Sequence, residues 1–240
     1  VNERDMRAVL ELAAQPGNQF IKEVFYLGCR YLGRATEFSY EHCLMPDEVI
    51  DSFERQFEGR ITRRDIMRFQ KLYFAFLHFW AVRKCFYVQH YLVLRDGRGG
   101  ITPVNEVIDL AAMEPRLDRY RRLASRWPWL ARAYLVAALA PFALNPRFLG
   151  LLREALKLKL LLYLGFDLAK LSSKTILLGF ITACDPMILD VQLAANCGKG
   201  EVSMDLGRQE AGAWANVMRE KCFLDRSHPI TGPMKDRVGS

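Results

Sequence analysis

The chain has 240 residues, of which 51% are apolar and 25% charged, so it is long enough for one large domain or two small ones and too apolar for intrinsic disorder. Its 34 Lys and Arg outnumber its 27 acidic residues, and the net charge of +7 favours an anionic partner such as nucleic acid, anionic lipid or an acidic protein surface. The six cysteines contain no C-x-x-C pair and the four histidines no H-x-x-x-H pair, which argues against zinc and haem sites, so we expect no metal and no cofactor.

The N-terminal part of the chain is predicted to be helical. Residues 4–14 form a short helix that stops at a Pro-Gly pair. Residues 19–38 carry apolar side chains at helical spacing, which predicts an amphipathic helix. Pro46, followed by two acids, is typical of a first helical turn and predicts a helix that ends at Gly59.

The most aromatic stretch is residues 65–94, in which eleven of thirty side chains are aromatic or imidazole rings. No Gly or Pro interrupts it, and Thr62 with Asp65 forms a variant capping box, so we predict one long helix. Its rings need a covering surface, and we expect partner packing from three of them: Phe76, Phe79 and Trp80.

The glycine-rich residues 95–100 interrupt this pattern. Tyr91–Leu94 and Ile101 would suit a small hairpin around Asp96-Gly97, but the flanking patterns favour helices. A capping Thr102 and Pro103 then predict a helix through Met113.

A basic cluster, two tryptophans and an apolar run follow in that order. This succession is typical of a helix that enters a membrane at the level of the headgroups. We expect lipid or anion contact from Arg119, Arg122, Arg126, Trp127 and Trp129. Residues 127–144 would span the bilayer, re-enter it or be buried, and the sequence leaves these alternatives open.

The rest of the chain is also predicted to be helical. Residues 148–171 are amphipathic and residues 176–184 apolar, which suggests a helical hairpin folded back at Asn145-Pro146, membrane-embedded or membrane-apposed. Two shorter helices are expected after Asp185 and over residues 204–224.

The predicted fold class is therefore all-α, a multi-helix bundle with a long aromatic helix over residues 65–94. Residues 1–95 are expected to form an aromatic amphipathic helical bundle and residues 101–224 a helical, membrane-associated hairpin region. Residues 225–240, poor in apolar side chains, are expected to be an extended tail.

No nucleotide-binding or nucleophile motif occurs in the chain, and we predict no catalytic residue and a protein that is not an enzyme. An active site assembled from distant residues is the alternative. His90 is expected to be a buried, hydrogen-bonded core residue, and the Arg98-Gly99-Gly100 segment a plain turn.

The order of an early amphipathic helix, an aromatic middle segment and late leucine-rich segments resembles the peroxin 11 type of membrane-remodelling protein. The corresponding segments are residues 19–38, 71–94 and 151–181. The resemblance is one of pattern and length, it implies membrane association, and it transfers no functional residue.

These features lead to a first hypothesis: a structural or accessory subunit of a membrane-associated complex. A mitochondrial inner-membrane assembly of the ATP synthase or respiratory complex type, or another organellar membrane, would suit it. Its expected partners are other subunits and an anionic, cardiolipin-like lipid. Free cysteines in apolar contexts favour the reducing side. The alternative is a soluble helical RNA-binding or ribosome-associated protein that uses the same arginines.

Overall fold

The computed structural model describes residues 3–28, 46–81, 88–165, 172–181, 200–203 and 208–211. Its contacts divide the chain into two units. The first contains residues 1–26, 50–82 and 89–179, and the second contains residues 27–49, 83–88 and 180–240. In the second unit, β5 (Gly200–Ser203) and β6 (Arg208–Ala211) form an antiparallel ribbon in which Gly200 lies opposite Ala211.

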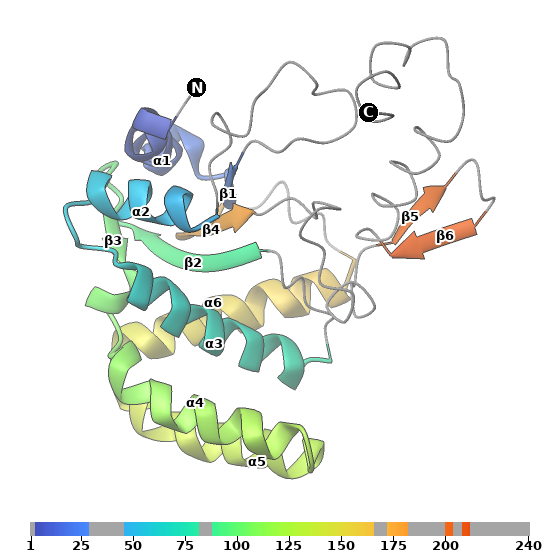
Figure 1. Cartoon of the computed structure of the whole chain (residues 1–240). Coiled ribbons are helices and arrows are strands. Elements are labelled where there is room, and N and C mark those ends of the chain that lie inside the picture. The colour runs from blue at the N-terminus through green and yellow to red at the C-terminus, as the bar shows by residue number, and fades with distance from the viewer. Residues whose placement is uncertain are drawn as a thin grey trace. The chain divides into compact units, whose positions relative to one another are not determined.

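Four short apolar segments form a mixed sheet. They are β1 (Glu23–Leu27), β2 (Val88–Arg95), β3 (Ile101–Pro103) and β4 (Thr175–Ile181), in the spatial order β1-β4-β2-β3. Strands β2 and β3 are antiparallel, with Val93 opposite Pro103. The prediction of an all-α bundle is therefore wrong, and the chain has an α/β fold (Figure 1).

The turn between β2 and β3 is closed by one carboxylate. Oδ1 of Asp96 accepts hydrogen bonds from the backbone N–H of Arg98 at 2.7 Å and of Gly100 at 2.8 Å. Gly97 has a φ of +80°, a conformation that glycine adopts without steric cost. These N–H groups are thus occupied within the turn, as the expectation of a plain turn requires.

In the described ranges, six α-helices accompany the sheet. They are α1 (Met6–Ala14), α2 (Pro46–Gln56), α3 (Arg63–Phe79), α4 (Leu110–Ala124), α5 (Pro128–Leu139) and α6 (Pro146–Tyr163). Short 3₁₀ turns also occur: η1 (Glu3–Asp5), η2 (Pro16–Asn18), η4 (Val104–Glu106) and η5 (Ala140–Leu144). The predicted capping box is confirmed, since Thr62 Oγ1 accepts from the Asp65 N–H and Asp65 accepts from the Thr62 N–H.

Within the first unit, one face of the sheet is closely packed. Successive strand side chains alternate between the two faces, and the buried members of β1 and β4 point the same way. The Tyr26 ring lies 5.4 Å from that of Phe53 of α2, tilted by 54°, and its hydroxyl donates a 2.8 Å hydrogen bond to the backbone oxygen of Met6 at the start of α1. On β4, Ile176 and Leu178 are fully buried. Helices α1 and α2 therefore cover this face.

The opposite face is covered by α3 and α6 (Figure 1). Two of its strand side chains, Leu92 and Leu177, are only half-buried. His90 is buried beside Gln70 of α3, with its Nδ1 3.2 Å from Oε1, so the prediction of a hydrogen-bonded core histidine is confirmed. The first unit is therefore less closely packed on this face of the sheet than on the other.

A half-buried arginine, Arg95, connects the N-terminal helix to the sheet. The guanidinium of Arg95, at the end of β2, donates to three backbone oxygens that precede β1 and to two at or just before the start of β4. The acceptors are Ala13, Asn18, Ile21, Ser173 and Thr175. Arg95 therefore ties the segment before β1 to the start of β4.

Two predicted helices are replaced in part by strands. Residues 19–38 contain β1, whose alternating exposed and buried side chains show a period of two rather than 3.6. Residues 65–94 do not form one helix: α3 ends at Phe79, and residues 88–95 form β2. The aromatic and β-branched side chains of this stretch satisfy a strand as well as a helix, and sheet pairing decides between them.

The other corrections concern residues 102–113 and 176–184. The first stretch forms the end of β3, then η4, and α4 begins only at Leu110 with Asp109 as its cap. Most of the second stretch belongs to β4, whose continuous apolar run suits a strand buried between two layers. The prediction of a helical hairpin is therefore also wrong, because α6 ends at Tyr163 and the next described element is strand β4.

The predicted membrane-embedded helices are also corrected. Helix α5 has 12 residues and is followed at Ala140 by η5, which contains Pro141, so residues 127–144 do not form one continuous helix. None of the helices in the described parts of the chain combines the length and the apolar character that crossing a bilayer requires. The expected helix after Asp185, most of the one over residues 204–224, and the tail at residues 225–240 lie outside the described residues.

Candidate functional site

A tight turn between α4 and α5 presents two tryptophans to solvent. The backbone N–H of Trp127 donates to the Leu123 oxygen at 2.7 Å, and Pro128 begins α5 with the fixed φ that suits a first helical position. Trp127 is 55% exposed and Trp129 is 69% exposed. Exposed indole rings that adjoin polar residues mark an interaction site more often than an accident of packing.

Arginines surround these rings. Arg122 and Arg126 are exposed, lie four residues apart, and form no ion pair with any described residue. Arg119 lies over the ring of Tyr134, with its guanidinium carbon 5.4 Å from the ring centre, and so joins α4 to α5. We call the surface of Arg119, Arg122, Arg126, Trp127 and Trp129 the Arg–Trp corner.

The charge around this corner is of one sign. Between Asp118 and Glu154 the sequence has seven arginines and no acidic residue. Those seven charges equal the net charge of the entire chain, which is +7. Positive charge is therefore concentrated in this part of the sequence, and the corner has a field that attracts anions.

The outer side of α5 continues the corner as an apolar surface. Leu130 is 39% exposed and Val136 is 60% exposed, and the alanines between and beyond them at helical spacing are exposed too. Only Ala131 and Leu135 are fully buried against the neighbouring helices. A helix that is apolar on all sides normally has all its sides covered, so this one leaves a face available for contact.

Ion pairs connect α3 to α4. Glu114 accepts hydrogen bonds from Lys71 at 2.7 Å and from Arg68 at 2.8 Å, and Lys71 also contacts Asp118. The bond from Lys71, followed by that from Arg68, lowers the pKa of Glu114 from 4.5 to about 2. This cluster neutralises the acids nearest to the corner and holds α4 in place.

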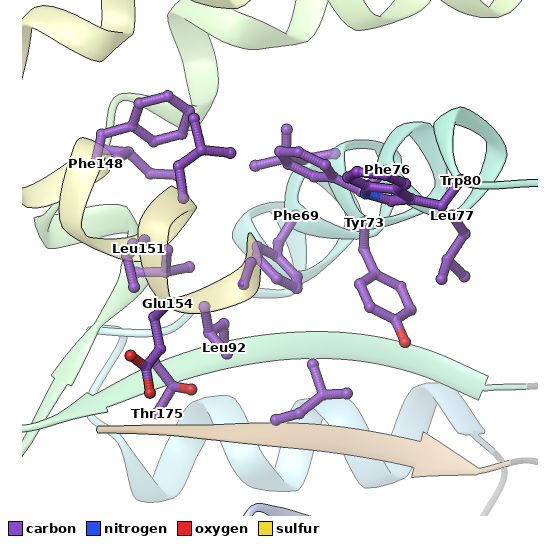
Figure 2. A pocket seen from close by; sticks show the side chains of 16 residues that line it. Phe69, Tyr73, Phe76, Leu77, Trp80, Leu92, Phe148, Leu151, Glu154 and Thr175 are labelled. Carbon is purple, nitrogen blue, oxygen red and sulfur yellow. The ribbon is translucent and has the colours of Figure 1, made fainter. Parts of the chain in front are cut away.

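An apolar cavity of about 380 Å³ lies between α3, α6 and the sheet. Figure 2 shows its walls, with rings from α3 facing Phe148 and Leu151 of α6 and with Leu92 beneath them. Its volume falls within the range of roughly 300–1,000 Å³ that small-molecule sites occupy. The half-covered face of the sheet is thus also the floor of the cavity.

Polar groups are confined to few positions in this cavity. Among the described residues, Glu154 of α6 is its one charged lining residue, and Thr175 of β4 also lines it. In Figure 2 both lie at the end away from Trp80. Glu154 forms no hydrogen bond or ion pair within the described residues, whereas the Thr175 hydroxyl lies 3.2 Å from that of Ser173. The cavity therefore has an apolar body and one anionic end.

A second apolar cavity, of about 400 Å³, lies between α3, α5 and α6. The two cavities share five lining residues: Phe76, Trp80, Phe148, Leu152 and Ala155. Val136 of α5 lines the second cavity and is largely exposed, so this cavity opens beside the outer side of α5.

The residues predicted to pack against a partner lie at these cavities. Phe76 and Trp80 line both, and Phe79 lines the second. The two predicted groups thus occupy different places: the rings of α3 surround the cavities, and the Arg–Trp corner lies at the α4–α5 turn. Sequence reasoning missed Glu154 and Thr175, although Glu154 is the single acid between Asp118 and Asp167 and could have been noticed on that account.

No group of three or more His, Cys, Asp or Glu able to hold a metal occurs among the described residues. Neither protein-family models nor curated proteins give a match to this chain. Two segments compared with peroxin 11 proteins, residues 19–38 and 151–181, contain strands β1 and β4 in place of the helices that the resemblance implies.

Proposed function

We propose that this protein is a non-enzymatic accessory subunit that attaches to an anionic membrane surface through the Arg–Trp corner and the outer side of α5. The observation that carries the proposal is the adjacency of exposed Trp127 and Trp129 to Arg122 and Arg126, which are exposed and form no ion pair within the described part of the chain. Tryptophan favours the headgroup region of a bilayer, and arginine is attracted to anionic lipid. Such a helix lies in the interface and does not need to span it.

The aliphatic side of α5 favours lipid over RNA as the anionic partner. Both ligands would use the arginines, and indole rings would stack on bases. Leu130 and Val136, however, extend the surface with aliphatic groups that offer no stacking face to a base, whereas they gain free energy on entering a hydrocarbon layer. The experiment must therefore distinguish RNA binding from lipid binding.

The proposal includes membership of a larger assembly, and the mitochondrial inner membrane is the membrane to test first. Membership of an assembly is supported by a further set of exposed apolar side chains on α6, where Leu156 is 53% and Leu160 56% exposed. Surfaces of this kind are typical of contact with other subunits. Isolation of the tagged protein from its native source, followed by identification of the chains that co-purify in stoichiometric amounts, tests this part.

Vesicle flotation tests the membrane part. The full chain is mixed with vesicles of phosphatidylcholine alone or with added cardiolipin, at low and at high salt. We expect binding only with cardiolipin, and weaker binding at high salt because salt screens the attraction between the arginines and the anionic lipid. Each arginine near an anionic surface contributes about 1 kcal/mol, so Arg122→Gln with Arg126→Gln should lower affinity roughly 30-fold.

Two matched variants serve as controls. Arg4→Gln with Arg98→Gln removes the same charge from other exposed positions, leaving a net charge of +5 (+7 − 2) in both variants, and should change binding little. Phe20→Ser, at a residue 60% exposed, is compared with Trp129→Ser. Equal losses in a variant and its control, or recovery with RNA but never with vesicles, would refute the membrane proposal.

A further inference from the structure

We propose that the cavity between α3, α6 and the sheet binds a single-chain aliphatic amine, with the ammonium group at Glu154 and the hydrocarbon chain along the rings of α3. This inference concerns a site other than the Arg–Trp corner and does not depend on membrane attachment. It stands on the volume of the cavity, the composition of its walls and the position of its one charge.

The walls select a hydrocarbon. Of the sixteen lining residues, all but a few contribute only carbon to the surface, and the aromatic ones come from successive turns of α3. Phe69, Tyr73 and Phe76 lie along one side of the cavity in Figure 2. Removing an aliphatic chain from water into such a site is favourable at about 25 cal/mol per Å² of apolar surface buried.

The length of the apolar space suits an extended chain. The first cavity adjoins the second at Phe76 and Trp80, since both residues line both spaces. The second continues between α5 and α6 to Val136. A chain held at Glu154 therefore has apolar walls along the first cavity as far as Phe76 and Trp80, where the second cavity begins.

The end group is selected by Glu154. Its carboxylate is half-buried and has no cationic or hydrogen-bonding partner within the described residues. An ammonium group would supply both a charge and N–H donors, and the Thr175 hydroxyl at the same end of the cavity offers a further acceptor. A fatty acid would place a second carboxylate beside the first, which like-charge repulsion disfavours.

The choice of an amine over a helix from another protein follows from the same geometry. A docking helix presents several side chains and needs a long open groove with polar groups along its rim. Here the charge is single and terminal, and the strand residues Leu92 and Leu177 form a floor beneath the rings of α3. One polar head and one narrow tail match this arrangement.

Isothermal titration calorimetry of the full chain, without vesicles, tests the proposal. Dodecylamine, dodecanol and dodecanoate are titrated below their micelle concentrations. We expect saturable one-to-one binding of dodecylamine, at least about tenfold tighter than dodecanoate, because a charge-assisted bond is gained with the amine alone. The net charge of +7 opposes non-specific uptake of a cation, so saturable binding at one site is informative.

Three variants locate the site. Glu154→Gln should lower the affinity for dodecylamine about tenfold or more and leave the affinity for dodecanol nearly unchanged, because only the amine interacts with the charge of Glu154. Glu58→Gln, at an exposed acid outside the cavity, is the matched control and should bind as the wild type does. Ala155→Phe places a ring where the two cavities meet and should abolish binding of both the amine and the alcohol.

Thermal unfolding of each variant establishes that it is folded. Equal affinity for dodecanoate and dodecylamine, or unchanged amine binding in Glu154→Gln, would overturn the assignment of the head group. Absence of saturable binding by the wild type, or full binding by folded Ala155→Phe, would overturn the site itself. None of these results depends on vesicle flotation, so the two proposals fail separately.

Discussion

The two faces of the sheet in the first unit differ in how completely they are covered. On the face covered by α1 and α2, Val24, Tyr26, Ile176 and Leu178 are each at most 8% exposed. On the face covered by α3 and α6, Leu92, Thr175 and Leu177 are half-buried and line a cavity of about 380 Å³. The packed face holds the fold together, and the other face tolerates empty space that a ligand can use.

The strongest test of this comparison uses adjacent leucines of β4. Leu178→Ala should lower the free energy of unfolding by about 3–4 kcal/mol, because it creates a cavity in a packed layer. Leu177→Ala removes the same atoms on the cavity side and should cost about 1 kcal/mol, since the space around it is already open. Urea unfolding of both variants measures the difference, and equal losses would mean that the two faces are packed alike.

A second test removes the arginine that ties the strands together. Arg95→Met leaves several backbone oxygens without their donor and should cost about 2–3 kcal/mol. Arg95→Lys should recover part of this loss, because an ammonium group donates to three acceptors at most. Arg98→Met, at an exposed position three residues on, is the control for urea unfolding. A loss no larger than that of the control would remove Arg95 from its structural role.

The smallest expected effect concerns pH and the helices on the cavity side. The folded protein holds the pKa of Glu114 at about 2, below its ordinary value of 4.5, so folding favours the ionised carboxylate. The stabilisation is therefore complete above pH 4.5 and is lost as the pH falls from 4.5 towards 2. Because the pair is partly exposed and screened, the loss should be on the order of 1 kcal/mol.

Glu114→Gln removes this part of the pH dependence. The difference in unfolding free energy between wild type and variant, measured at pH 6 and again near pH 2.5, should shrink at the lower pH. Glu11→Gln, which breaks an exposed pair with Arg7, is the control and should show a smaller change. A constant difference for Glu114→Gln across this range would show that the carboxylate titrates normally.

The sequence predicted those elements that depend on interactions between residues close together in the chain. The helix after Pro46 and the capping box of Thr62 and Asp65 follow from interactions within a few residues, and the structure confirms both. The strands could not be predicted from such local interactions. Residues 88–95 and 175–181 are short apolar runs that fit a helix or a strand, and only their pairing within one sheet decides between the two.

The same limit applies to the candidate sites. The Arg–Trp corner is contiguous in sequence, so its residues could be named in advance, and the structure places them around one turn. The cavity could not be predicted, because its charged end needs Glu154 and Thr175, which are brought to one place by a helix and a strand. A lone acid in an apolar helix is a hint, but only the fold supplies the space beside it.

Val136 belongs at once to the outer side of α5 and to the wall of the second cavity. A molecule in the cavity and a surface against α5 therefore meet the same side chain from two directions. Thermodynamic linkage makes any influence between them symmetrical: the factor by which lipid vesicles alter amine affinity must equal the factor by which the amine alters affinity for vesicles.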